Sequence, residues 1–178
     1  MRHFPIFLDL RARRVIVGGA GECALAKLRL LVKTEAQIVV FGHNAVEGVV
    51  ALAGAGQITL HDRAPLLADF AQAALGYAAY DDDAADAAFA ALAHGAGVLL
   101  NVVDNLEASA FITPAIVDRD PVVVAIGTEG AAPVLARQIK ADLEQRLPET
   151  LGRLARLGQG FRAAAQVLAP GRARRDFW

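Results

Sequence analysis

The chain has 178 residues, of which 55% are hydrophobic and 21% are charged, with a net charge of −1 and one cysteine. This length fits one ordinary domain, with or without a small appendage, and a single cysteine excludes an internal disulfide framework. The longest stretch without a charged residue, 87–103, is interrupted by polar residues and is shorter than the ~20 apolar residues of a membrane helix. The opening residues lack the apolar core of a secretion signal, so we expect a cytoplasmic protein without a membrane span.

The first half of the chain alternates between short β-branched runs and longer segments with helical periodicity. Strands are predicted at 14–17, 37–41, 57–60, 75–80 and 98–103. Helices are predicted at 22–33, 45–53, 65–74 and 83–93, each between two of those strands. This alternation predicts an α/β fold of Rossmann type, in which a parallel sheet is covered by helices on both faces.

The pattern changes after Asp104. Two strand-like runs, 110–112 and 122–126, flank a turn around 118–121, and two helices are predicted at 133–147 and 149–168. Pro148 fits the first turn of the second helix, because its missing N–H costs nothing there. We place a domain boundary near Thr113. The predicted parts are a Rossmann domain at 1–112, a small α+β segment at 113–147 and a helical segment at 148–178.

Charge is unevenly distributed along the chain. Residues 137–178 hold nine Lys or Arg against four Asp or Glu, a net charge of +5, which leaves −6 for residues 1–136. A basic segment of this kind holds an anionic ligand, attracts nucleic acid or simply solvates a helix surface. No aromatic residues alternate with the basic ones, so binding of nucleic acid is not expected.

A glycine-rich turn stands between the first predicted strand and the first predicted helix. Its spacing, Gly19-x-Gly21-x-x-Ala24, is that of a dinucleotide-binding loop, in the setting that such a loop requires. The first glycine makes the tight turn, and the second lets a pyrophosphate approach the backbone. The free N–H groups of the helix N-terminus then face the phosphates. The competing interpretation is a glycine turn with a structural role alone.

The predicted cofactor is NAD, favoured only slightly over NADP. No arginine that would bind a 2′-phosphate follows the second strand, but the usual carboxylate for the ribose is missing there too, so Asn44 or backbone groups would serve. For Cys23 a small packing role competes with cofactor binding. Asp81, Asp82 and Asp83 also fit capping of the next helix. The residues predicted to bind the cofactor are Gly19, Ala20, Gly21, Glu22, Cys23, Asn44, Asp81 and Val102.

Asp104 is the predicted catalytic residue. It directly follows the predicted strand 98–103, so it emerges at the carboxyl edge of the parallel sheet, where ligands of such folds bind. A carboxylate that is partly desolvated beside a cofactor can act as a general base. The competing interpretation is a cap of the loop.

The chain resembles the dehydrogenase–ferrochelatase module of siroheme synthesis, which is the N-terminal part of the multifunctional siroheme synthases. The resemblance rests on FPIFLDL at 4–10, VIVGGAG at 15–21, NVVD at 101–104, SAFITPAIVDR at 109–119, PVLAR at 133–137 and RRDFW at 174–178. It covers essentially the whole chain. It implies NAD-dependent oxidation of precorrin-2 to sirohydrochlorin and insertion of Fe²⁺ to give siroheme, with Asp104 as general base in both steps.

The resemblance also implies an assembly and a substrate site. Members of the family are homodimers, so 113–147 is expected to be a dimerisation segment and 148–178 to help form the tetrapyrrole cleft. The substrate is a polycarboxylate, and the residues predicted to bind it are Arg119, Thr128, Arg137 and Lys140. No metal ligands are predicted in the chain, because the macrocycle supplies them. Longer members continue into a uroporphyrinogen methyltransferase domain, which is expected here beyond residue 178.

The chain departs from the family pattern at several positions. Glu129 stands where the family has glycine, Ala132 lacks the usual hydroxyl, and Tyr80 replaces a threonine. Glu129 and Tyr80 favour a second hypothesis, a non-catalytic module that binds a tetrapyrrole or a nucleotide. A third hypothesis is an NAD-dependent dehydrogenase of another anionic substrate.

Overall fold

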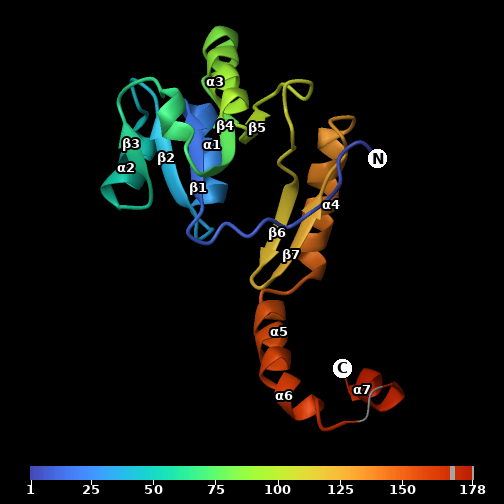
Figure 1. The fold of residues 1–178 in the computed structure, drawn as a ribbon. Helices are drawn as coiled ribbons and strands as arrows, with labels where there is room; N and C mark the ends of the chain where they lie inside the picture. Colours follow the sequence, from blue (N-terminus) through green and yellow to red (C-terminus); the bar gives the residue numbers. More distant parts are fainter. Residues whose placement is uncertain (169–170, 178) are drawn as a thin grey trace. The chain divides into compact units, whose positions relative to one another are not determined.

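The computed structural model describes residues 1–168 and 171–177, and the chain forms two compact units, Met1–Ile112 and Thr113–Trp178 (Figure 1). The first unit is a parallel α/β sheet of Rossmann type, which confirms the predicted fold class. None of the helices within the described residues is both long and apolar enough to cross a bilayer. Dimerisation and cleft formation by the second unit stay predictions.

Five strands form the sheet of the first unit. They are β1 (Arg14–Gly18), β2 (Gln37–Phe41), β3 (Thr59–His61), β4 (Ala73–Ala78) and β5 (Leu99–Val102). All pairs are parallel and the order is β3-β2-β1-β4-β5, so Val15 of β1 lies between Ile38 of β2 and Leu75 of β4. The chain builds one side of the sheet first and then crosses over to β4. Ligands of such sheets bind at this switch point between β1 and β4, outside the carboxyl ends of the strands.

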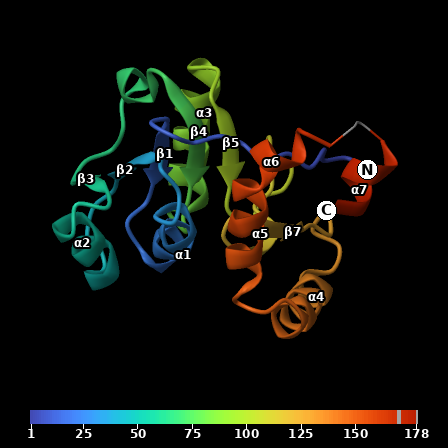
Figure 2. The ribbon, with the colours of Figure 1, turned by 90° about the horizontal axis from the view of Figure 1, so that it is seen from below.

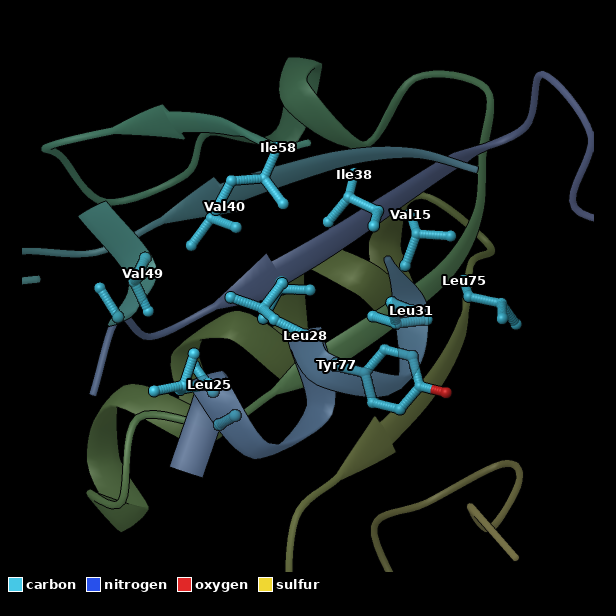
Figure 3. Packing of buried hydrophobic residues seen from close by; sticks show 14 residues of the cluster. Val15, Leu25, Leu28, Leu31, Ile38, Val40, Val49, Ile58, Leu75 and Tyr77 are labelled. Carbon is cyan, nitrogen blue, oxygen red and sulfur yellow. The ribbon is translucent and has the colours of Figure 1, made fainter. Parts of the chain in front are cut away.

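Helices bury both faces of the sheet. Val15 and Val17 belong to the apolar cluster of the face that carries α1 (Glu22–Leu31) and α2 (Glu47–Gly54), which lie next to each other (Figures 2 and 3). Ile16 points to the opposite face, under α3 (Asp83–Gly95). Full burial of each such side chain contributes about 1.5–3 kcal/mol. The continuous apolar run of β1 therefore places this strand at the centre of the sheet.

The predicted helix at 65–74 is wrong. Only a 3₁₀ turn, η1 (Leu67–Phe70), forms there, and Ala73 already belongs to β4. Asp69 folds its side chain back onto the turn, where it accepts hydrogen bonds from the Arg63 guanidinium at 2.7 and 2.8 Å. These contacts stabilise a closed turn. A helix cannot continue beyond it, because the residues from Ala73 onward pair with β1 as strand β4.

The second unit opens with an antiparallel hairpin of β6 (Ala115–Arg119) and β7 (Val122–Ile126), on which α4 (Pro133–Arg146) packs (Figure 1). Strand β6 was not predicted, and the predicted strand at 110–112 is wrong. That segment is held by isolated bonds instead, such as the one that the Ala110 N–H donates to the Leu100 carbonyl at 2.7 Å.

The predicted second helix, 149–168, is interrupted. The chain forms α5 (Leu151–Gly160) and α6 (Arg162–Ala165), which separate at Phe161, and then α7 (Arg172–Phe177). Glycines in the last turn of α5 favour this interruption because glycine is a poor helix former. Pro148 stands before the helix and not in its first turn. Residues 169, 170 and 178 of the predicted helical segment lie outside the described residues.

Candidate functional site

The glycine loop has the geometry of an anion-binding turn. Gly19 has φ +100°, and a Cβ there would overlap the Ala79 carbonyl oxygen, so only glycine makes this turn. Gly21 is the N-cap of α1, with an extended backbone and no capping side chain. Nothing lies within 4 Å of the place where a Gly21 Cβ would be. The first N–H groups of α1 thus face open space, which fits the pyrophosphate of a dinucleotide.

The remaining loop residues lie as a backbone cradle. Ala20 is buried, and its carbonyl accepts from the Val46 N–H at 3.0 Å, while Glu22 is exposed in the first turn of α1. Gly42, directly after β2, was missed by the sequence reasoning. A Cβ at Gly42 would lie 2.9 Å from the Ala20 nitrogen, so this glycine lets the end of β2 touch the loop. Its signal was a glycine immediately after a predicted strand.

The edge beyond β2 carries a contact between a histidine and an aspartate that sequence reasoning also missed. Asn44, the predicted ribose ligand, is exposed and has a left-handed backbone with φ 53°. Its neighbour His43 contacts Asp62, which follows β3, with 2.6 Å between Nδ1 and Oδ1. A carboxylate that follows the next strand thus lies at this edge. Only the pairing of β2 with β3 could reveal it.

Four predicted residues come together around one cavity of about 510 Å³ at the carboxyl edge of β4 and β5. They are Cys23 of α1, Asp81 of the β4–α3 loop, and Val102 and Asp104 at the end of β5. The cavity is acidic, because Asp82, Asp83 and Asp86 line it as well. Within the described residues, the His, Cys, Asp and Glu side chains form no group of three or more arranged to hold a metal ion.

Asp104 occupies a tight turn. The Asn105 N–H donates to the Val102 carbonyl at 3.1 Å, and Asp104 between them has φ 59°. Asp81 has the same φ of 59° in the loop after β4. Non-glycine residues in the left-handed region are uncommon, and such conformations often occur at functional sites. Both carboxylates are exposed to the cavity side of the sheet edge rather than packed into the core.

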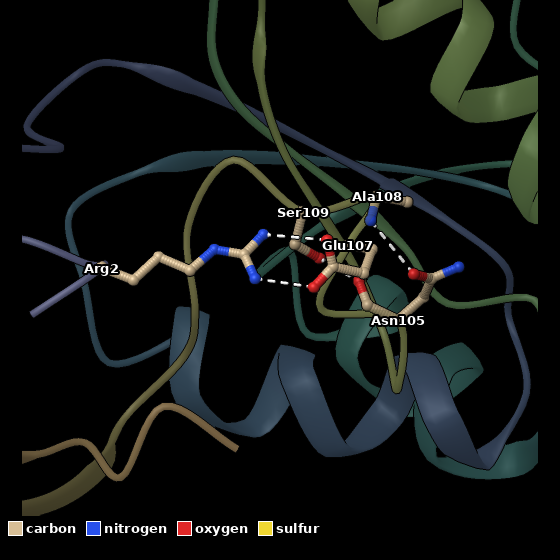
Figure 4. A network of polar contacts seen from close by, with 5 residues as sticks. All are labelled: Arg2, Asn105, Glu107, Ala108 and Ser109. Atoms are coloured by element: carbon tan, nitrogen blue, oxygen red, sulfur yellow. Dashed lines mark hydrogen bonds and ion pairs between the residues drawn. The ribbon is translucent and has the colours of Figure 1, made fainter. Parts of the chain in front are cut away.

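Hydrogen bonds of Ser109 fix the turn that carries Asp104. Figure 4 shows Ser109 beside Asn105, the residue that follows Asp104. The Ser109 hydroxyl accepts from the Val102 N–H at 2.9 Å and lies 2.7 Å from the Asn105 carbonyl oxygen. Asn101, which is 7% exposed, donates to the Phe111 carbonyl at 2.9 Å. Sequence reasoning treated these two polar residues only as parts of family motifs. Ser109 thus holds the Asp104 turn directly, and Asn101 connects β5 to residues 109 and 111.

The pKa values of two side chains that line the acidic cavity, Cys23 and Asp86, are raised. Burial raises the pKa of the Cys23 thiol, and the charges of Asp104 and Asp81 raise this pKa further, against the opposing effect of Lys27. Burial also raises the pKa of Asp86, whose carboxylate accepts from the backbone N–H of Tyr80 at 3.0 Å. A thiol with a raised pKa is a poor base at neutral pH. Asp104 is the better candidate for proton transfer.

The three aspartates at 81–83 have different positions relative to α3. Asp82 is the N-cap of α3 and accepts from the Ala85 N–H at 2.8 Å, and Asp83 lies in the first turn of the helix. The predicted capping is therefore confirmed for this helix. Asp81 lies before the helix and lines the cavity together with these two residues.

Tyr80 lies against the glycine loop. Its ring is 6.1 Å from the ring of Phe89, and a Cβ at Gly18 would meet both rings. Burial raises the pKa of Tyr80 to about 12, and the charge of Asp86 adds to the rise while a hydrogen bond with the Gly19 backbone opposes it. The departure from the family threonine thus places a large side chain behind the phosphate turn, while the Gly21 side of the turn stays open.

The predicted substrate residues all lie in the second unit. Thr128 precedes α4, and Arg137 and Lys140 lie on the first turns of that helix, with Lys140 Nζ 3.6 Å from Glu144 Oε1. Arg119 is not with them. Its guanidinium donates to the Glu144 and Leu147 carbonyls at 3.0 and 2.9 Å, so it stabilises the other end of α4.

A groove of about 1090 Å³ also lies in the second unit. Leu154, Leu157 and Phe161 give it apolar walls, and Arg162 and Arg174 give it positive charge. Arg174 also donates to the Gln166 and Leu168 carbonyls at 3.1 and 2.6 Å.

Comparisons with known proteins identify the family of the chain. Residues 6–115 match a family model described as "Putative NAD(P)-binding". All of the chain aligns with siroheme synthases from Chromobacterium violaceum, at 45% identity, and Methylococcus capsulatus, at 42% identity, and covers 38% of each. The chain thus spans well under half the length of these relatives.

A solved structure has the same fold. The chain is similar to SirC, a precorrin-2 dehydrogenase, with a TM-score of 0.75 over 98% of this chain and 86% of that one, at 21% sequence identity. The predicted cofactor is of the class that the matched family binds. The resemblance to siroheme synthases that the sequence motifs suggested is confirmed. The glycine loop, the parallel sheet and the family match together show that the chain belongs to this NAD(P)-binding family. It corresponds to part of a siroheme synthase.

Proposed function

We propose that the chain is an NAD-dependent dehydrogenase module that oxidises precorrin-2 to sirohydrochlorin. The observation that carries the proposal is the cavity in which the Asp104 carboxylate lies beside the helix of the glycine loop. The similarity to siroheme synthases over the full chain supports this choice of substrate. The proposal includes a homodimer formed through 113–147. It also includes continuation into a methyltransferase domain, which is consistent with the greater length of the relatives.

The dinucleotide is held chiefly by backbone groups. The N–H groups around Gly21 and Glu22 bind the pyrophosphate at the open N-terminus of α1, and Gly19 keeps the turn tight enough for that approach. Asn44 lies at the ribose end, and Asp81 and Val102 line the cavity at the other end. Bound NAD⁺ supplies the hydride acceptor.

Asp104 takes up the proton that accompanies the oxidation. Removal of a hydride and a proton from precorrin-2 gives sirohydrochlorin, NADH and H⁺, so the protein needs one proton acceptor. The Asp104 turn, fixed by Ser109, holds a carboxylate at the strand edge for this purpose. Cys23 does not compete, because its raised pKa keeps it a neutral thiol near pH 7.

The same carboxylate serves the proposed insertion of Fe²⁺. Pyrrole N–H protons leave as the metal enters the macrocycle, and Asp104 accepts a proton in this step as well. Fe²⁺ is a substrate here, bound by the nitrogens of the tetrapyrrole.

The second unit contributes charge for the polycarboxylate. Thr128 precedes α4, and Arg137 and Lys140 lie within the helix, where Arg137 is exposed and Lys140 makes a long ion pair with Glu144. These three residues remain candidates for binding the side-chain carboxylates of the substrate. Arg119 is a weaker candidate, because its guanidinium is occupied by carbonyl groups of α4.

A non-catalytic binding module is the second candidate, and Tyr80 favours it. Its half-buried ring behind Gly18 and its bond to the Gly19 backbone restrain the glycine loop. Glu129 adds a negative charge and a backbone φ of 53° where the family has glycine.

One assay separates these functions. Precorrin-2 and NAD⁺ are mixed with the protein without oxygen, and formation of sirohydrochlorin is followed by absorbance. We expect turnover by the wild type, loss of at least about a hundredfold in Asp104→Asn, and near-normal turnover in Asp83→Asn. The second variant removes the same charge from the same cavity. Binding of NAD⁺ and sirohydrochlorin without turnover would establish the binding module instead. Full activity of Asp104→Asn would remove the assignment of the base.

A further inference from the structure

We propose that Asp62 recognises the adenosine ribose of the cofactor and makes the protein select NAD over NADP. This inference rests on the proposed function, because it assigns a residue to the dinucleotide site described above. The carboxylate that usually binds this ribose is missing after β2, and Asp62, which follows the neighbouring strand β3, takes its role.

Hydrogen bonds connect the glycine loop to the ends of β2 and β3. The Gly19 N–H donates to the Phe41 carbonyl at 2.8 Å, and the Gly42 N–H donates to the His61 carbonyl at 3.1 Å. Gly42 also approaches the Ala20 nitrogen so closely that a Cβ there would lie 2.9 Å away. The residues that follow β2 and β3 therefore lie beside the loop that takes the pyrophosphate. In this fold the ribose next to the pyrophosphate reaches the end of the second strand.

The Asp62 carboxylate is held at that edge and remains available. His43 fixes it through the contact of 2.6 Å between Nδ1 and Oδ1, yet the side chain of Asp62 is 81% exposed. A carboxylate accepts about four hydrogen bonds, so one contact leaves room for ribose hydroxyls. Exposed ion pairs contribute only about 0–1 kcal/mol to stability, so folding alone gives little reason for this pair.

The nearby arginine is not available for a phosphate. Arg63 directly follows Asp62 but makes two hydrogen bonds to Asp69, at 2.7 and 2.8 Å, and its guanidinium lies 4.7 Å from the centre of the Phe41 ring. The cation nearest in sequence is thus neutralised, and His43 is paired with Asp62 itself. The group that this edge presents is a carboxylate.

A carboxylate distinguishes the two cofactors by charge. The hydroxyls of the NAD ribose donate hydrogen bonds to it. The 2′-phosphate of NADP brings further negative charge to the same place and has no proton to donate, so the two groups repel each other. His43 is a positioning residue that keeps the carboxylate at this edge.

The test measures binding and not turnover. NADH and NADPH are titrated into the whole 178-residue chain, and their fluorescence gives the ratio of the two dissociation constants. We expect the wild type to prefer NADH. Asp62→Asn should lower that preference about tenfold, which corresponds to about 1.4 kcal/mol. The matched control is Asp9→Asn, which removes an exposed aspartate that pairs with Arg11 before β1, away from the carboxyl edge.

Each outcome decides the question. A preference for NADH that falls in Asp62→Asn and stays in Asp9→Asn supports the assignment, and His43→Ala should then shift the ratio in the same direction. If Asp62→Asn keeps the wild-type ratio within twofold, or if the wild type prefers NADPH, Asp62 is not the selector, while dinucleotide binding stands. If neither NADH nor NADPH binds the wild type, the proposed function fails together with this inference.

Discussion

Two glycines of the same loop should respond to substitution in opposite ways. Gly21 has φ −87° and open space in front of its missing Cβ, so Gly21→Ala fits the fold. Gly19 has φ +100° and faces the Ala79 carbonyl, so Gly19→Ala is strained in the folded chain. The pair therefore separates a glycine needed for a ligand from a glycine needed for folding.

The magnitudes follow from these surroundings. We expect Gly19→Ala to lower the free energy of unfolding by about 2–4 kcal/mol, from positive φ and overlap with a backbone carbonyl. Gly21→Ala should change it by no more than about 1 kcal/mol, because alanine is only a somewhat poorer N-cap than glycine. Its methyl group occupies the space of the pyrophosphate, and loss of one charge-assisted hydrogen bond of about 1.5–3 kcal/mol weakens NADH binding about 10- to 100-fold.

Thermal unfolding and NADH titration measure the two effects on the same samples. The expected result is an early melting transition for Gly19→Ala, and for Gly21→Ala a transition near that of the wild type with much weaker NADH binding. Should Gly21→Ala bind NADH within twofold of the wild type, the pyrophosphate does not lie against these amides, and the reasoning on the loop is refuted.

Three further predictions concern carboxylates and the thiol. Alkylation of Cys23 by iodoacetamide at pH 8 should be slow and become faster in Asp104→Asn, because removal of that charge lowers the thiol pKa; mass spectrometry follows the rate. Asp69→Asn should lower the free energy of unfolding at pH 7 by about 1 kcal/mol. The hydrogen bond with Arg63 lowers the Asp69 pKa to about 2, so the stabilisation exists above pH 4 and is lost as the pH falls through about 2. Asp86→Asn should raise the melting temperature at pH 7, because burial raises the Asp86 pKa and the charged form costs stability; the gain should vanish in acid, where wild-type Asp86 is protonated.

Controls make the results on Cys23 and Asp86 specific. Asp83→Asn should leave the alkylation rate of Cys23 unchanged, and a similar acceleration there would mean that the thiol senses the whole cavity and not Asp104. Glu47→Gln removes an exposed carboxylate from the first turn of α2 and should not raise the melting temperature. A lower melting temperature of Asp86→Asn at pH 7 would show that its hydrogen bond with Tyr80 needs the negative charge.

Much of the first unit could be predicted because its signals are local. A β-branched run such as Val15–Ile16–Val17 favours a strand by itself, and the spacing of apolar residues in α1 favours a helix. The glycine loop is also a local signal, since the steric demands on Gly19 arise within a few residues of the turn. The position of Asp104 at the carboxyl edge could be predicted because the end of a parallel strand already specifies an edge of the sheet.

The misses have a different physical cause. The 3₁₀ turn in place of the helix at 65–74 depends on the hydrogen bond between Arg63 and Asp69. The break at Phe161 and the strand β6 likewise depend on contacts that form only on folding, such as the pairing of β6 with β7. Short apolar runs are compatible with several structures, and tertiary contacts decide between them.

The order of residues along the chain by itself determined the alternating α/β fold, the phosphate loop and the position of Asp104, because steric limits and periodicity act over a few residues. Only the tertiary structure decided that Asp62 contacts His43 beyond the end of β2, that Arg119 holds the end of α4, and that Ser109 fixes the turn of Asp104. Those roles depend on hydrogen-bond partners that are distant in sequence. No local pattern specifies such a partner, since it is selected by the packing of whole strands and helices.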